Sequence, residues 1–161
     1  IMTFAKAYSM EIEHVRPHGA MYRQAAENIE TSRTIARAIK KCSKWLIYYG
    51  ATGDNLAQVG EEENLQVAHE VHLEKIYDTN GNIDFSARDL ENTNVSIQRL
   101  KDLLQNSQVS NNVGGKTIVR ADSIHFSNKL PNAKDLVIQA RGIIEPLPYN
   151  YKNAQNSGWV D

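Results

Sequence analysis

With 161 residues, the chain is long enough to form one domain with a real hydrophobic core. Its 18 lysines and arginines nearly balance its 19 aspartates and glutamates, which argues against a protein that binds nucleic acid or another polyanion. The single cysteine, Cys42, excludes an internal disulfide framework and a multi-cysteine zinc site, and it fits a reducing compartment.

The apolar segments of the chain are short. The longest run, at residues 45–49, falls far below the roughly 20 residues that a membrane span requires. Residues 1–7 lack the basic start and the apolar centre of a signal peptide, and an isoleucine in first place suggests processing or an incomplete chain. We therefore expect a soluble, cytoplasmic protein that has no membrane partner.

The first part of the chain predicts two helices followed by a strand. Residues 12–17 are expected to be extended, because Pro17 disfavours helix just before it. Apolar side chains at helical spacing predict a helix over residues 20–29 and a second helix that Thr31 or Ser32 caps. Residues 45–49 form a continuous apolar run, which is typical of a central parallel strand buried on both faces.

The rest of the chain continues this alternation of helices and strands. Turn residues at 50–54 and 78–82 separate the elements, and three glutamates at 61–63 are expected to form a solvated helix end. Periodicity predicts, in this order, a helix, a strand, a helix, a strand and a helix over residues 54–63, 65–72, 95–104, 123–126 and 131–142.

Strands that alternate with helices predict the α/β class, with a parallel sheet and helices packed outside it. We expect residues 1–145 to form a single α/β domain. Residues 146–161 contain two prolines and three asparagines without a helical period, so we expect an extended or disordered tail.

Several short segments resemble a known family, in the family's own order. Residues 14–22 read H-V-R-P-H-G-A-M-Y and are similar to the segment H-V-K-P-H-G-A-L-Y of the LamB/YcsF family. Residues 50–53 fall on its G-L-x-G turn, and residues 70–77, E-V-H-L-E-K-I-Y, fall on its E-V-F-A-D-R-x-Y. Residues 78–81 match the turn that follows, and residues 131–133 match the start of its last helix.

The resemblance covers roughly residues 4–144 and the C-terminal part of the family, which includes the A subunit of 5-oxoprolinase. It implies part of a (β/α) barrel-like domain whose N-terminal βα units are missing here. It also implies that the chain acts with partner protein subunits, which open the lactam ring of 5-oxoproline with ATP and release glutamate.

Three departures from the family pattern bear on this expectation. The N-terminal third of the family has no counterpart in this chain. The histidine and aspartate of the family's late C-V-H-G-D segment fall on Ser127 and Lys129. The family's A-D-R has become L-E-K at residues 73–75, and a lysine does not reproduce the fork of an arginine.

Three residues are candidates for a lactam-hydrolysing site. Arg16 could bind a substrate carboxylate through two parallel hydrogen bonds, it could be an ordinary solvated arginine, or it could form an ion pair with Glu13. His18 could carry protons or bind a metal, or it could serve only as a turn residue. Glu70 could pair with Arg16 or His18, it could act as a general base, or it could point outward from its strand. We expect Arg16, His18 and Glu70 to cluster at one end of the sheet.

The turn at residues 50–53 is a candidate cofactor site. Gly50 and Gly53 flank a turn ahead of a helix, so its backbone N–H groups could cradle the phosphates of ATP, although any tight turn favours glycine. No residue is assigned to a metal, and the metal status stays open. His69 and His72 are three apart on a strand, hence on opposite faces, and His125 is interpreted as a core histidine.

Two functions from different classes remain open. One is a catalytic component of a lactam hydrolase, in which Arg16 binds the substrate and His18 and Glu70 handle protons. The other is a non-catalytic structural or interaction subunit derived from the same family, which the replacements at Ser127 and Lys129 favour. A barrel without its first units leaves strand edges that a partner should cover.

Overall fold

The computed structural model describes residues 2–90 and 92–144, and it contains a four-stranded parallel sheet. The strands lie in the order β1-β2-β3-β6, and every neighbouring pair is parallel. They are β1 (His14–Val15), β2 (Ile47–Ala51), β3 (Gln66–His72) and β6 (Ser123–His125). The predicted α/β class and parallel sheet are confirmed.

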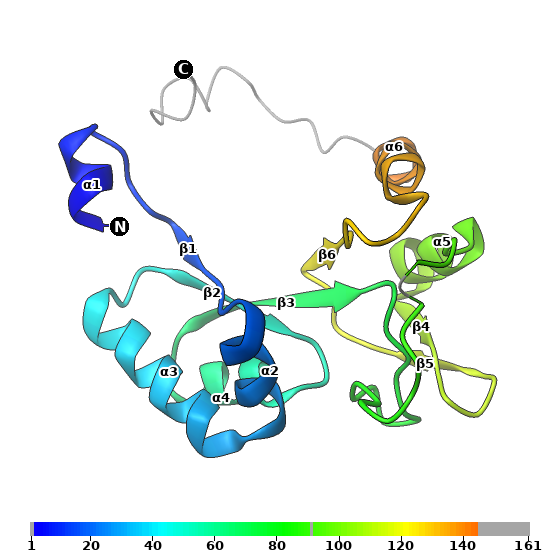
Figure 1. Cartoon of the computed structure of the whole chain (residues 1–161), viewed down its shortest axis with the longest axis horizontal. Coiled ribbons are helices and arrows are strands. Elements are labelled where there is room, and N and C mark those ends of the chain that lie inside the picture. Colours follow the sequence, from blue (N-terminus) through cyan, green and yellow to red (C-terminus); the bar gives the residue numbers. More distant parts are fainter. Residues whose placement is uncertain (1, 91, 145–161) are drawn as a thin grey trace.

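Five of the helices form two groups, one around β2 and one near β6, and the N-terminal helix stands apart from both (Figure 1). One group packs around β2 and includes Leu56 and Ala36 in its core, whereas the other packs near β6 and includes Leu100 and Leu136. The helices are α1 (Met2–Ala7), α2 (Gly19–Glu27), α3 (Ile29–Cys42), α4 (Asn55–Glu62), α5 (Ile97–Asn106) and α6 (Ala133–Ile143). Among the described residues, none of these helices has the length and apolar character that a bilayer crossing requires.

Helix α3 begins earlier than its sequence predicts. Asn28 is the N-cap, and its side-chain oxygen accepts a hydrogen bond from the backbone N–H of Thr31 at 2.9 Å. The prediction that Thr31 or Ser32 caps the helix is therefore wrong. Ser32 is buried instead and donates a hydrogen bond to the carbonyl of Asn55, which links α3 to α4.

Strand β2 lies inside the sheet, as predicted, but only one of its faces is fully buried. Leu46 and Tyr48 are 5% and 0% exposed, because the helices α2, α3 and α4 cover their side of the sheet. Ile47 is 37% exposed on the opposite face, and Trp45 precedes the strand and is 72% exposed. The prediction of burial on both faces is wrong for this reason.

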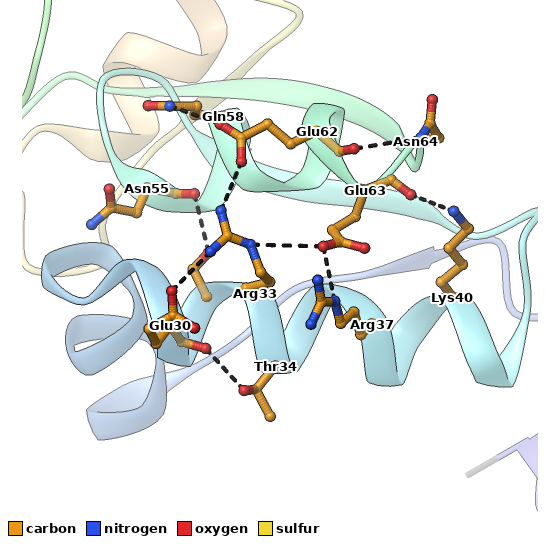
Figure 2. A network of polar contacts seen from close by, with 11 residues as sticks. Glu30, Arg33, Thr34, Arg37, Lys40, Asn55, Gln58, Glu62, Glu63 and Asn64 are labelled. Atoms are coloured by element: carbon orange, nitrogen blue, oxygen red, sulfur yellow. Dashed lines mark hydrogen bonds and ion pairs between the residues drawn. The ribbon is translucent and has the colours of Figure 1, made fainter.

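The helix end at residues 61–63 is largely exposed, as expected, and its glutamates also form ion pairs. Figure 2 shows Arg33 and Arg37 of α3 facing the end of α4. Arg33 Nη2 lies 3.0 Å from Glu62 Oε2, and Arg37 Nε lies 2.9 Å from Glu63 Oε1. Such partly exposed pairs contribute about 0–1 kcal/mol each, so they align α3 with α4 more than they stabilise the fold.

Two small elements and two boundaries differ from the prediction. Helix α1 was not predicted, and neither was the antiparallel hairpin of β4 (Gln108–Ser110) and β5 (Lys116–Ile118). The last helix starts at Ala133, two residues after Pro131, and it runs through Gly142 to Ile143. The tail predicted over residues 146–161 lies outside the described residues.

Candidate functional site

Charged and aromatic side chains meet where the parallel strands end. Arg16 follows β1 directly, and Glu70 and His72 lie on one face near the end of β3. His125 is the last residue of β6, and the strand register places it beside His72. The carboxyl ends of parallel strands are where α/β folds commonly place chemistry. We refer to Arg16, Glu70, His72, Glu74 and His125 as the edge cluster.

An ion pair connects Arg16 with Glu70. Arg16 Nη2 lies 2.9 Å from Glu70 Oε2, and the side chains are 30% and 9% exposed. Arg16 Nη1 also lies 3.4 Å from His125 Nδ1. The structure thus brings together two of the three predicted site residues, and it shows Glu70 facing Arg16 rather than pointing outward.

His18 occupies a different position from this ion pair. It is exposed, and it is the N-cap residue of α2 without a side-chain hydrogen bond to the helix. Among the described residues, no hydrogen bond or ion pair joins His18 to Arg16 or Glu70. Its assignment as a proton carrier stays a prediction.

His72 lies between two carboxylates in the buried part of the edge cluster. Its Nε2 is 3.3 Å from Glu70 Oε2, without the alignment of a hydrogen bond, and its Nδ1 is 3.2 Å from Glu74 Oε1. Burial alone would lower the pKa of His72, but the two carboxylates raise it above its ordinary value. Burial alone would raise the pKa values of Glu70 and Glu74, but the facing His72 outweighs burial and lowers both, with the Arg16 charge adding to the effect at Glu70.

The histidine pair His72 and His125 was not predicted as a site. The two ring centroids are 4.5 Å apart, and His125 is half-buried at the strand end. The interpretation of His125 as an ordinary core histidine is therefore wrong. Burial lowers its pKa, and the charge of His72 lowers it further. His69, as expected, points to the other face of β3, where its Nε2 lies 3.0 Å from Glu61 Oε1.

A second pair, Tyr22 and Asp54, adjoins the edge cluster. The Tyr22 hydroxyl donates a hydrogen bond of 3.1 Å to Asp54 Oδ2, and the Tyr22 ring lies 6.1 Å from the His72 ring. Asp54 is also the N-cap of α4, where its Oδ1 accepts from the backbone N–H of Leu56 at 2.7 Å. Burial raises the pKa of Asp54 to about 6, so this carboxyl group exchanges its proton close to neutral pH.

Gly50 and Gly53 are required by backbone packing. A Cβ atom on Gly50 would lie 2.6 Å from the backbone nitrogen of Ala57 in α4. Gly53 has a φ of +79° and packs against the backbone of Gly81 and Asn82. Neighbouring backbone therefore fills the space beside both glycines, and their role as a phosphate cradle stays a prediction.

Ser127 has a structural role in the turn after β6. It is buried, and its hydroxyl oxygen accepts a hydrogen bond of 3.2 Å from the backbone N–H of Lys129. The backbone N–H of Leu130 donates to the carbonyl of Ser127 at 3.1 Å. These contacts explain why a small polar residue suits this position.

His72 and Glu74 were not predicted as site residues, although the sequence contains a pattern that indicates them. Glu70, His72 and Glu74 alternate with the apolar residues Val71 and Leu73. Alternate residues of a strand share one face, so this spacing predicts that the three titratable groups lie on the same side; in the structure Glu70 and His72 do so on β3, and Glu74 follows in the turn after the strand.

The fold and the site define a parallel α/β protein with a charged cluster at the carboxyl edge of its sheet. A model of the LamB/YcsF family matches residues 1–156, and the chain belongs to this family. It is 28% identical to the 5-oxoprolinase A subunit of Bacillus licheniformis, in a match that covers 85% of this chain and 60% of that protein. It is 31% identical to the 5-oxoprolinase A subunit of Tolumonas auensis, in a match that covers 75% of this chain and 49% of that protein.

A solved structure agrees with this relationship. The crystal structure of a lactam utilization protein from Thermus thermophilus superposes with a TM-score of 0.69 at 28% identity. The match covers 88% of this chain and 57% of that chain. The chain thus spans about half to three-fifths of the length of these relatives.

Proposed function

We propose that this chain is a partner-dependent component of an enzyme that hydrolyses a cyclic amide of the 5-oxoproline type to glutamate, with ATP as co-substrate. Its family membership supports the substrate class, because relatives are named as the A subunit of 5-oxoprolinase and a solved relative is named a lactam utilization protein. Because these relatives are named as one subunit of an enzyme, their names also support the need for partner subunits. The observation that carries the proposal is the Tyr22–Asp54 pair beside the edge cluster.

Opening a lactam requires an attacking water molecule, a polarised carbonyl group and a proton for the departing nitrogen. Asp54 suits the proton transfer, because a carboxyl group with a pKa of about 6 gives and accepts a proton near neutral pH. Tyr22 orients this group through its hydrogen bond. In this proposal Asp54 takes the role of acid or base, and His18 remains a second candidate at the start of α2.

Glu70 and Arg16 have linked roles in the proposal. The pKa of Glu70 is lowered, so it stays ionised and is a weaker base than its assignment as a catalytic base requires. Arg16 remains the candidate for binding the substrate carboxylate, and its side chain is 30% exposed. A substrate carboxylate would have to share the guanidinium with Glu70. We include ATP as co-substrate because the chain is related to 5-oxoprolinase.

The same ion pair favours the second candidate function, a non-catalytic structural or interaction subunit. Arg16 and Glu70 neutralise each other, so the residues expected to bind substrate and to act as base already have partners. In the described part of the chain the sheet ends at β1 and β6, and each edge could pair with another chain.

An assay of glutamate release separates these two functions. The purified chain is incubated with 5-oxoproline and ATP, first alone and then with the partner subunits of a bacterial 5-oxoprolinase. We expect no release from the chain alone and release above a heat-killed control once partners are added. Absence of release in both reactions would favour the non-catalytic role, whereas release by the chain alone would contradict its dependence on partners.

A further inference from the structure

We propose that His72, Glu74 and His125 form a binding site for one divalent transition-metal ion of the Zn²⁺ type. Each of these side chains offers one ligand atom, and the three atoms all lie within 4.8 Å of one another. The inference concerns metal binding and does not depend on lactam hydrolysis.

The distance between two of the ligand atoms matches a shared ion. His72 Nδ1 and Glu74 Oε1 are 3.2 Å apart and share a hydrogen bond, whose proton a metal ion would replace. Zinc bonds of about 2.0–2.1 Å in a tetrahedral site separate neighbouring ligand atoms by about 3.3 Å. These two atoms therefore already have the separation of two ligands on one ion.

The carboxylate of Glu74 has an unsatisfied atom in this position. The Glu74 side chain is 5% exposed, and its buried Oε2 has no hydrogen-bond partner among the described residues. A buried carboxylate with an unpartnered oxygen is costly, and a cation bound to this carboxylate would compensate its charge.

Glu70 lies beside the second ring nitrogen of His72, where metal-binding histidines usually have an outer partner, although the two atoms lack the alignment of a hydrogen bond here. With Nδ1 of His72 on the metal, its Nε2 carries the proton and faces Glu70 Oε2 at 3.3 Å. Arg16 in turn holds Glu70 at 2.9 Å. A carboxylate that accepts from the second ring nitrogen orients a histidine for metal binding, and this arrangement recurs in zinc sites.

His125 completes the set from the neighbouring strand. Its ring lies 4.5 Å from that of His72, and it is the half-buried member of the three, on the accessible side. Arg16 Nη1 lies 3.4 Å from His125 Nδ1, a long contact. Metal binding would replace this contact, because a neutral imidazole has a single lone pair. Arg16 would keep its ion pair with Glu70.

The donor set indicates which ions fit. Two imidazoles and one carboxylate suit Zn²⁺ and similar first-row ions, and three protein ligands leave a coordination position open for water or a small ligand. Glu70 and Glu74 together carry two negative charges against the single charge of Arg16, so a divalent cation is electrostatically favoured when the histidines are neutral.

The test measures binding of Zn²⁺ and Co²⁺ to the full chain without an affinity tag. Zn²⁺ binding is followed by calorimetry, and Co²⁺ binding by the visible absorption of a four- or five-coordinate ion. We expect one equivalent of either ion, and His125→Gln and Glu74→Gln should each weaken binding by at least about 10–100-fold. Circular dichroism verifies that each variant is folded.

His69→Gln is the matched control, because His69 lies on the same strand but points to the opposite face. This variant should bind both ions as the wild type does. Because Glu74 is buried, the half-buried His125 variant decides the outcome if Glu74→Gln does not fold. The proposal is overturned if the wild type binds less than one equivalent, or if His125→Gln binds Zn²⁺ as tightly as the wild type.

Discussion

Arg16 and Glu70 form an ion pair of 2.9 Å that joins the end of β1 to β3 across the intervening strand β2. The Glu70 side chain is 9% exposed, so its charge depends on the arginine and on the neighbouring His72 for compensation. This contact fixes the positions of Arg16 and Glu70 in the edge cluster, so any function of either residue has to be compatible with it.

Breaking this ion pair from one side should destabilise the fold. Removing one partner of a buried pair leaves an uncompensated charge and costs about 3–5 kcal/mol, and the partial exposure of Arg16 reduces the expected loss to about 1–3 kcal/mol. We expect this loss for Arg16→Met in urea denaturation.

The double variant Arg16→Met with Glu70→Gln identifies the cause of that loss. It should be less destabilised than the sum of the two single variants, because no unpaired charge remains. Strictly additive losses would mean that the ion pair has no energetic role.

Gly50→Ala should destabilise the chain. The added Cβ would lie 2.6 Å from the backbone nitrogen of Ala57, and a helix backbone cannot yield as a flexible side chain can. We expect a loss of about 1–3 kcal/mol in thermal or urea unfolding. Gly142→Ala in α6 is the control, because among the described residues no atom beyond its chain neighbours and its own helix backbone lies within 4 Å of the added Cβ, and it should be neutral or slightly stabilising. Equal effects of both substitutions would contradict the packing role of Gly50.

Asp54 should make stability fall as the pH rises. Its pKa is raised from 3.8 to about 6 in the folded chain, so between these values the folded state binds more protons than the unfolded state. Protonated Asp54 contributes on the order of 2–3 kcal/mol to the free energy of unfolding. This contribution is fully present below about pH 4 and is lost as the pH rises through 6. Asparagine retains the capping oxygen and removes the charge.

The comparison of Asp54→Asn with the wild type from pH 4 to 7.5 checks this prediction. The variant should gain stability relative to the wild type as the pH increases. A difference between the two proteins that does not change with pH would show that burial leaves the Asp54 carboxyl unperturbed.

The sequence predicted the parallel sheet and most helices because long apolar patterns dominate those elements. The apolar periodicity extends over several turns or pleats in these elements, which are the strand at 65–72 and the first two long helices. The hairpin of β4 and β5 was missed because each of its short strands contains a single apolar residue, which does not establish an alternation. The exposed side of β2 was missed because an apolar run does not reveal how many layers cover it.

The candidate site was predicted in part. The resemblance identified Arg16 and Glu70, and the structure brings them into contact. The metal-ligand geometry of His72 with His125 depends on pairing between β3 and β6, which are far apart in the sequence. The raised pKa of Asp54 depends on burial by distant elements, and the sequence alone does not contain that information.

The proposed role of Asp54 in lactam hydrolysis is tested most directly by glutamate release from the assembly of this chain with partner subunits, 5-oxoproline and ATP. Asp54→Asn should lower the rate by about 10²–10⁴-fold, as loss of an acid–base group commonly does. Asp135→Asn is the control, since Asp135 is exposed in the first turn of α6, and it should retain the wild-type rate. Wild-type turnover by the Asp54→Asn assembly would contradict the account, because hydrolysis would then proceed without the carboxyl group that burial tunes to near-neutral pH.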